Sequence, residues 1–123
     1  MSEAYDLYQL GRARLREGFA AQATVPLEKA RRLEPEKASI REALGIAYFR
    51  ITDWTSAERE FRKLLELSPV DDYAHYALGR SLMRQGRARE ASIHLKLALP
   101  EAAASGRDRR LELVARVDVE VGQ

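Results

Sequence analysis

The chain has 123 residues, of which 46% are hydrophobic and 33% are charged, and its formal net charge at pH 7 is only +2. This size and balance fit one small soluble domain, and they argue against a multidomain enzyme or a strongly basic nucleic-acid binder. Because the chain has no cysteine, it can form no disulfide, thiolate zinc site or cysteine nucleophile.

Alanine, leucine, glutamate and arginine dominate the composition, which favours helix over sheet. Three kinds of residue recur at an offset of 34: a glycine that follows a leucine, then an alanine, then a bulky apolar residue. In chain order they are Gly11, Ala23 and Leu27, then Gly45, Ala57 and Phe61, then Gly79, Ala91 and Leu95. A fixed period of this length is typical of a stacked array, and it predicts units at 4–37, 38–71 and 72–105.

Each unit is expected to be a helical hairpin. In the second unit one apolar face runs through Leu44, Ala47, Tyr48 and Ile51, and after a turn another runs through Ala57, Phe61, Leu64 and Leu65. We expect the recurring glycine and the alanine that faces it to let the two helices approach closely.

The connections within the units are also predicted. Gly18 and Gly86 stand at the turns of the first and third units, where glycine adopts a positive φ at little cost. Thr52 takes that place in the second unit, and Asp53 is the expected N-cap of the helix that follows. Trp54 is expected to pack between hairpins.

The end of the chain departs from the period. Pro35 and Pro69 stop the second helices of the first two units, whereas Pro100 comes three residues early, so we expect the last of these helices to end near Ala98. Residues 106–123 would then cover the edge of the array, either as a helix over 107–117 or as an extended segment that pairs with another chain.

These residues resemble the tetratricopeptide repeat pattern, which is W-x2-L-G-x2-Y, then A-x3-F, then P. The resemblance implies an all-α fold, a right-handed α-solenoid of three antiparallel helix hairpins with a C-terminal capping segment, forming one domain over 1–123. The chain departs from the pattern at Leu7, Arg41 and His75, which replace the tryptophan, and at Ala103, which replaces the proline.

In this family the first helices line a concave face that binds a peptide. Here the first and third units carry the same Tyr–Tyr–Arg–Arg stripe at an offset of 68, and the second unit places Ser39 and four other residues between them. Tyrosine and arginine are frequent binding anchors, so a peptide with acidic or carboxylate groups is the expected partner. The predicted groove comprises Tyr5, Tyr8, Arg12, Arg16, Glu42, Ile46, Phe49, Arg50, Tyr73, Tyr76, Arg80 and Arg84.

No residue set suggests catalysis, a metal or a cofactor. His75 and His94 are far apart in sequence and are interpreted as packed or surface residues without a partner, and no phosphate-binding or serine-nucleophile motif is present. We therefore expect a non-enzymatic interaction module without cofactors. No stretch could span a membrane or serve as a secretion signal, so a cytoplasmic location is expected.

Two other functions stay open. The C-terminal segment could join two chains, which would make this a structural or oligomerisation module. The tyrosines and arginines could instead stack on RNA or another single strand, although the small net charge argues against this.

Overall fold

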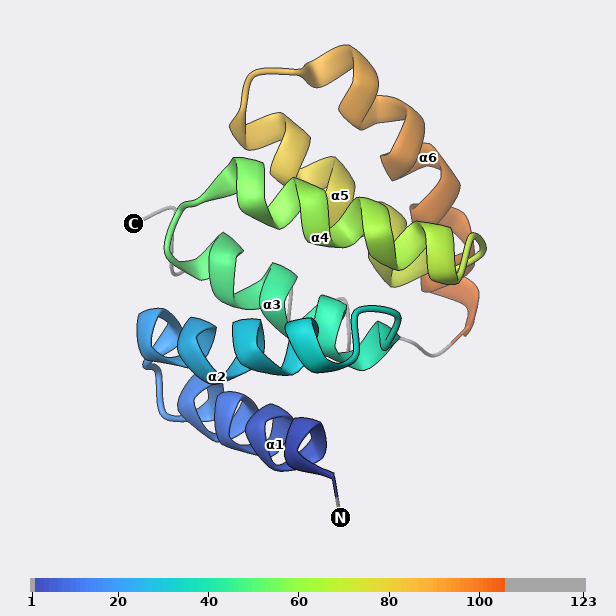
Figure 1. Ribbon diagram of the computed structural model, residues 1–123. Coiled ribbons are helices and arrows are strands. Elements are labelled where there is room, and N and C mark those ends of the chain that lie inside the picture. Colours follow the sequence, from blue (N-terminus) through green and yellow to red (C-terminus); the bar gives the residue numbers. More distant parts are fainter. Residues whose placement is uncertain (1, 106–123) are drawn as a thin grey trace.

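The computed structural model describes residues 2–105, which form helices and no strand. The helices are α1 (Glu3–Arg16), α2 (Ala20–Leu33), α3 (Ala38–Arg50), α4 (Trp54–Leu67), α5 (Asp72–Arg84) and α6 (Ala88–Ser105). Figure 1 shows them as antiparallel hairpins stacked in chain order, from α1–α2 to α5–α6. The predicted all-α helical solenoid is confirmed, while residues 106–123, with the predicted capping helix or extended tail, lie outside the described residues.

The turns within the hairpins have the predicted backbone. Gly18 and Gly86 adopt φ values of 87° and 77°, and Thr52 adopts 64° at the equivalent place in the second hairpin. A positive φ is costly for a β-branched residue, so Thr52 is a strained position. The next residue, Asp53, accepts a hydrogen bond from the Ser56 backbone N–H at 3.2 Å, which confirms the predicted N-cap of α4.

The two helices of each hairpin approach at the recurring glycines, but the residue that fills the space is not the alanine. A Cβ atom on Gly45 would lie 2.5 Å from the Phe61 ring, and one on Gly79 would lie 2.7 Å from the Leu95 side chain. Beside Gly11 the nearest atoms belong to Leu27. The recurring spacing therefore places a large side chain in the space that each glycine leaves.

The prediction that α6 ends near Ala98 is wrong, because the helix continues to Ser105. Proline in a helix interior removes one hydrogen bond, but the four residues that follow Pro100 are glutamate and three alanines, all strong helix formers. The second helix of the first hairpin behaves in the same way, since α2 runs through Pro26 to Leu33.

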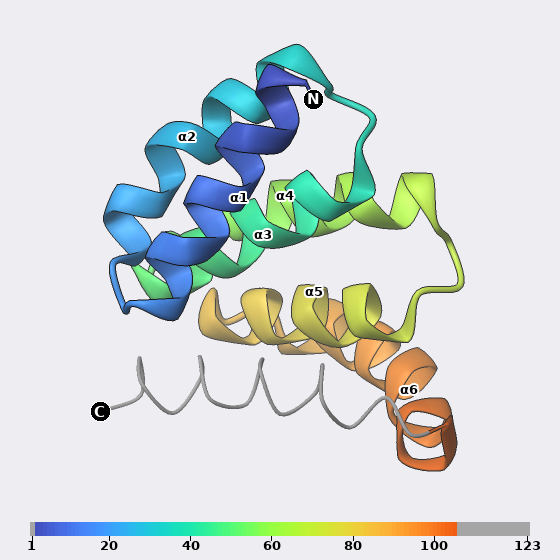
Figure 2. The same ribbon diagram turned by 90° about the horizontal axis from the view of Figure 1, so that it is seen from below.

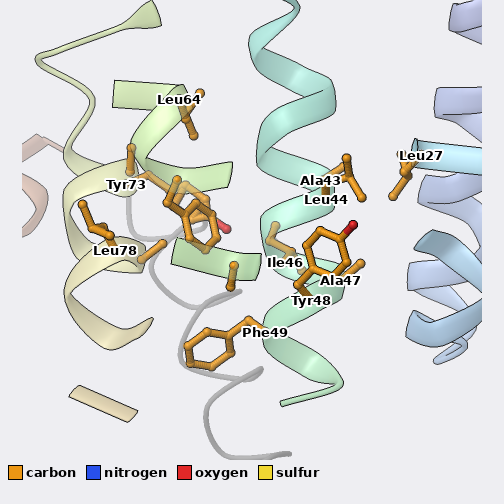
Figure 3. Close-up of a cluster of buried hydrophobic side chains, with 14 of the residues drawn as sticks. Leu27, Ala43, Leu44, Ile46, Ala47, Tyr48, Phe49, Leu64, Tyr73 and Leu78 are labelled. Atoms are coloured by element: carbon orange, nitrogen blue, oxygen red, sulfur yellow. The ribbon is translucent and has the colours of Figure 1, made fainter. Parts of the chain in front are cut away.

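One hydrophobic core connects the hairpins from α2 to α6. Figure 3 shows how it is built: Leu27 of α2 faces Leu44 of α3, and Leu64 of α4 and Leu78 of α5 lie further along the stack. All four side chains are almost completely buried. Among the described residues, no helix combines the length and the hydropathy needed to cross a bilayer.

Candidate peptide-binding groove

The first helices of the hairpins, α1, α3 and α5, follow one another across one face of the molecule (Figure 2). A hollow of about 270 Å³ lies between α1 and α3 on this side, and we call it the arginine hollow. It is lined by Tyr8, Arg12, Leu15, Arg16, Ser39, Glu42, Ala43, Ile46 and Arg50. Six of the residues predicted for the groove therefore come together, three from each helix.

A second hollow of about 300 Å³ continues the first toward the start of α1, and we call it the N-terminal hollow. It is lined by Ser2, Ala4, Tyr5, Tyr8, Glu34, Lys37, Ser39 and Ile40. Tyr8 and Ser39 line both hollows, so the two form one continuous depression across the first hairpin and the start of the second. Tyr5 is 45% exposed here, and its ring is accessible from solvent.

The arginines of the arginine hollow differ in their surroundings. Arg50 is half-buried, and its Nη1 donates a hydrogen bond to the Leu15 carbonyl oxygen at 2.7 Å, which ties α3 to α1. Arg12 and Arg16 are exposed, and neither forms an ion pair within the described residues. The Arg12 guanidinium carbon lies 5.6 Å from the centre of the Tyr8 ring, a distance at which a cation–π interaction is favourable.

The third hairpin does not repeat this arrangement, although its sequence does. Tyr73 is only 1% exposed, and its ring packs edge-on against Phe61 with a centroid distance of 6.4 Å, whereas the equivalent Tyr5 is exposed. The physical reason is that α4 of the preceding hairpin packs against α5, while no described helix precedes α1. Tyr73 therefore belongs to the core, which corrects its predicted place in the groove.

Two apolar residues predicted to anchor a peptide are also largely enclosed. Phe49 is 2% exposed and packs edge-on against Trp54 with a centroid distance of 4.9 Å, so it serves as core. Ile46 is 5% exposed but still contributes to the wall of the arginine hollow. Trp54 lies between hairpins as predicted, with the Arg84 guanidinium 5.6 Å from its ring centre.

The remaining predicted residues lie on α5 and line neither hollow. They are Tyr76, Arg80 and Arg84, all half-buried. Conversely, the sequence did not identify Leu15 and Lys37 as lining residues. Lys37 is the N-cap residue of α3. Because the first helices form this face, the residue just before such a helix could have been predicted to lie at its edge.

The prediction that the two histidines have no partner is wrong. Nδ1 of His75 lies 3.1 Å from Nδ1 of His94, and the rings are nearly parallel with an interplanar angle of 23°. They are 19 residues apart, but the antiparallel packing of α5 and α6 brings them together. Within the described residues no group of three or more histidine, aspartate or glutamate side chains is arranged to hold a metal ion.

Comparison with known proteins points to one family. The family model described as tetratricopeptide repeat matches residues 43–107. The type IV pilus assembly protein PilF of Pseudomonas aeruginosa is 31% identical over 120 residues, which are 97% of this chain and 48% of PilF. The chain thus spans about half the length of this relative. The solved structure of PilF has a TM-score of 0.71 at 28% identity, over 98% of this chain and 54% of PilF.

Two further structures share the fold. The R50E mutant of MamA has a TM-score of 0.76 at 26% identity, over 80% of this chain and 72% of MamA. The type III secretion translocator chaperone SycD of Yersinia enterocolitica has a TM-score of 0.78 at 17% identity, over 97% of this chain and 89% of SycD. The family match covers more than half of the chain and agrees with the stacked hairpins, so the chain belongs to the tetratricopeptide repeat family.

Proposed function

We propose that the chain binds a peptide segment carrying acidic side chains in the depression formed by the arginine hollow and the N-terminal hollow. As a tetratricopeptide repeat domain it is a protein–protein interaction module, and this proposal specifies where and what it binds. The observation that carries it is the pair Arg12 and Arg16, two exposed cations at the edge of a hollow and without ion pairs in the described part of the chain.

Two neighbouring cations repel each other, so leaving both uncompensated is unfavourable without an anionic partner. A peptide carboxylate between them would gain charge-assisted hydrogen bonds from guanidinium groups, whose planar fork suits carboxylate geometry. Arg50 supports the site in another way. Its hydrogen bond to the Leu15 carbonyl holds α1 and α3 at a fixed separation, so the hollow is formed before the peptide arrives.

The walls would supply contact area and direction. Tyr5 and Tyr8 present large, stiff rings along the depression, and Ile46 and Ala43 give the arginine hollow an apolar wall. Arg12 and Arg16 come from α1, whereas the apolar wall comes from α3. The peptide would therefore turn its carboxylates toward α1 and an apolar side chain toward α3.

The proposal is tested with a fluorescein-labelled peptide of alternating glutamate and leucine, and a matched peptide in which glutamine replaces glutamate. Arg12 and Arg16 are exposed, so each contact is worth about 0.5–1 kcal/mol. The double variant Arg12→Gln/Arg16→Gln should therefore bind the acidic peptide about tenfold more weakly by fluorescence anisotropy. Binding of the glutamine peptide should hardly change.

Arg32→Gln/Arg89→Gln is the matched control, because both residues are exposed on second helices and line neither hollow. It removes the same charge and should leave affinity unchanged, apart from a general charge effect that salt screens. Equal affinity of the parent and Arg12/Arg16 variants for the acidic peptide would refute the proposal. Competition by single-stranded polyuridine as strong as that by unlabelled peptide would favour the RNA-binding alternative instead.

The relationship to PilF indicates a class of partner. PilF is named for type IV pilus assembly, and the alignment spans nearly all of the present chain. We propose that the acidic segment belongs to a protein component of a larger assembly.

A further inference from the structure

The His75–His94 pair occupies a position that recurs in every hairpin. In the second hairpin the equivalent residues are Arg41 and Glu60, and in the first they are Leu7 and Pro26, each offset by 34 residues. The position lies between the first and second helix of its hairpin. Its chemistry changes along the stack, from apolar to ionic to imidazole.

In the second hairpin the residues at this position hold α3 and α4 together. Arg41 Nη1 donates to Glu60 Oε1 at 3.0 Å, and Arg41 Nε donates to the Pro35 carbonyl oxygen, also at 3.0 Å. Arg31 of α2 adds a second hydrogen bond to Glu60, which is completely buried. No histidine takes part in these contacts, so they do not depend on histidine titration.

The third hairpin copies the geometry with titratable groups. His75 Nε2 lies 3.1 Å from the carbonyl oxygen of Pro69, the counterpart of Pro35, and a carbonyl can only accept, so Nε2 carries a proton. In the neutral ring Nδ1 of His75 is then an acceptor. The 3.1 Å contact to His94 is therefore a hydrogen bond in which His94 Nδ1–H donates to His75 Nδ1.

The surroundings of the pair do not favour two positive charges. Arg62 and Glu66 of α4 line a hollow with His94, and Leu65 there occupies the place that Arg31 has in the second hairpin. On α6, Glu90 lies one turn before His94, but it already accepts hydrogen bonds from Arg62 and Arg87.

At the start of α5, the Asp71 carboxylate caps the Ala74 backbone N–H. Burial lowers the pKa of His94, as do His75 and Arg62, while Glu90 opposes them.

We propose that the His75–His94 hydrogen bond is a pH-sensitive contact that holds α5 and α6 together. It is formed at neutral pH and breaks in mild acid. A first proton can be taken at the outer Nε2 of His94 without breaking the Nδ1–Nδ1 hydrogen bond. A second proton must enter at Nδ1 of His75, which turns the acceptor into a donor and places two cations in contact. The hydrogen bond is then lost, and α6 loosens from α5 while the ion-paired second hairpin stays closed.

The sign of the pH dependence follows from this. The second proton enters the folded pair only by breaking the Nδ1–Nδ1 hydrogen bond, which the unfolded chain does not have, so the unfolded chain binds more protons as the pH falls below about 6.5. Stability contributed by the neutral pair is present above that pH and is lost as the pH falls further. The two histidines are the only ones in the chain, so histidine titration reports on this pair alone.

The test compares the thermal unfolding of the full chain at about pH 7.5 and about pH 5. The matched variant is His75→Arg/His94→Glu, which rebuilds the Arg41–Glu60 pair in the third hairpin. The parent chain should lose about 3–8 °C more in melting temperature between the two pH values than this variant does. An equal loss in both proteins would overturn the proposal.

Two measurements on the parent chain keep the test decisive if the variant does not fold. Histidine NMR titration should show two coupled steps, the second below the ordinary range, and two independent steps near pH 6.5 would overturn the proposal. Amide exchange, corrected for its intrinsic pH dependence, should show α5 and α6 losing protection at about pH 5 before the ion-paired α3 and α4. An equal loss of amide protection in all helices would contradict a contact that acts only on the third hairpin. Neither measurement uses a peptide, so the proposed binding function is tested separately.

Discussion

Replacing Glu60 by glutamine should strongly destabilise the chain. Its carboxylate is 0% exposed and accepts hydrogen bonds from Arg31 of α2 and Arg41 of α3, so it joins the first two hairpins. The Glu60→Gln variant keeps the shape but leaves two cations without their countercharge in a partly buried place. Arg31 and Arg41 side chains are 24% and 14% exposed, so water relieves part of the cost.

Breaking a buried ion pair by removing one partner costs about 3–5 kcal/mol, and partial exposure of the arginines lowers our expectation to about 2–4 kcal/mol. Burial alone would lower the pKa of Arg31, yet Glu60, Tyr48 and Glu28 raise it overall, which indicates that the cation depends on this carboxylate environment. Urea unfolding followed by circular dichroism should show a lower midpoint with an unchanged slope.

Two controls define the outcome. Glu66→Gln removes a carboxylate whose side chain is 70% exposed, 3.7 Å from Lys63, and should cost less than about 0.5 kcal/mol. The triple variant Arg31→Leu/Arg41→Leu/Glu60→Leu replaces all charges together and should be within about 1 kcal/mol of the parent, because the desolvation cost disappears with them. A cost below about 1 kcal/mol for Glu60→Gln, or a triple variant as unstable as the single one, would refute this reasoning.

Three further predictions concern single positions. Thr52→Gly should stabilise the chain by about 0.5–1.5 kcal/mol in urea unfolding, because glycine relieves the positive φ, and a loss of stability would contradict the strain. Gly45→Ala should cost about 1–3 kcal/mol, since the new Cβ would lie 2.5 Å from the Phe61 ring, and a neutral effect would show that the ring moves freely. Burial and the hydrogen bond to Glu28 raise the pKa of Tyr48 to about 12. The stability contributed by its neutral phenol is therefore present below about pH 10 and lost as the pH rises through 12. Near-ultraviolet titration should show one tyrosine that ionises later than the others, and the absence of such a tyrosine would contradict this assignment.

The hairpins and their turns could be predicted because their causes are local. A glycine or threonine at the turn, an N-cap aspartate and apolar residues at helical spacing act within a few residues of each other. The repeat offset then aligned the close approaches at Gly45 and Gly79. It did not reveal that Phe61 and Leu95, rather than the alanines, fill the notches, since that depends on how the helices are rotated.

The site was predicted less completely because periodicity takes no account of which helices pack against a given position. Tyr5 and Tyr73 have the same place in the repeat, but among the described residues a preceding hairpin packs against Tyr73 and none packs against Tyr5. The histidines were missed for another reason. Each was judged by its sequence neighbours, whereas alignment at the repeat offset with Arg41 and Glu60 would have indicated that they face each other.

The ion pairs between hairpins also determine the order in which the hairpins can stack, although the repeat period is the same throughout. Arg31 of the first hairpin is complementary to Glu60 of the second, and Arg62 of the second pairs with Glu90 of the third. A chimera with the last two hairpins exchanged would place Arg31 opposite His94 instead of Glu60. Arg31 would then lack its buried carboxylate partner. The hairpins share one fold but are not interchangeable. The charged side chains between them specify which hairpin can pack next to which.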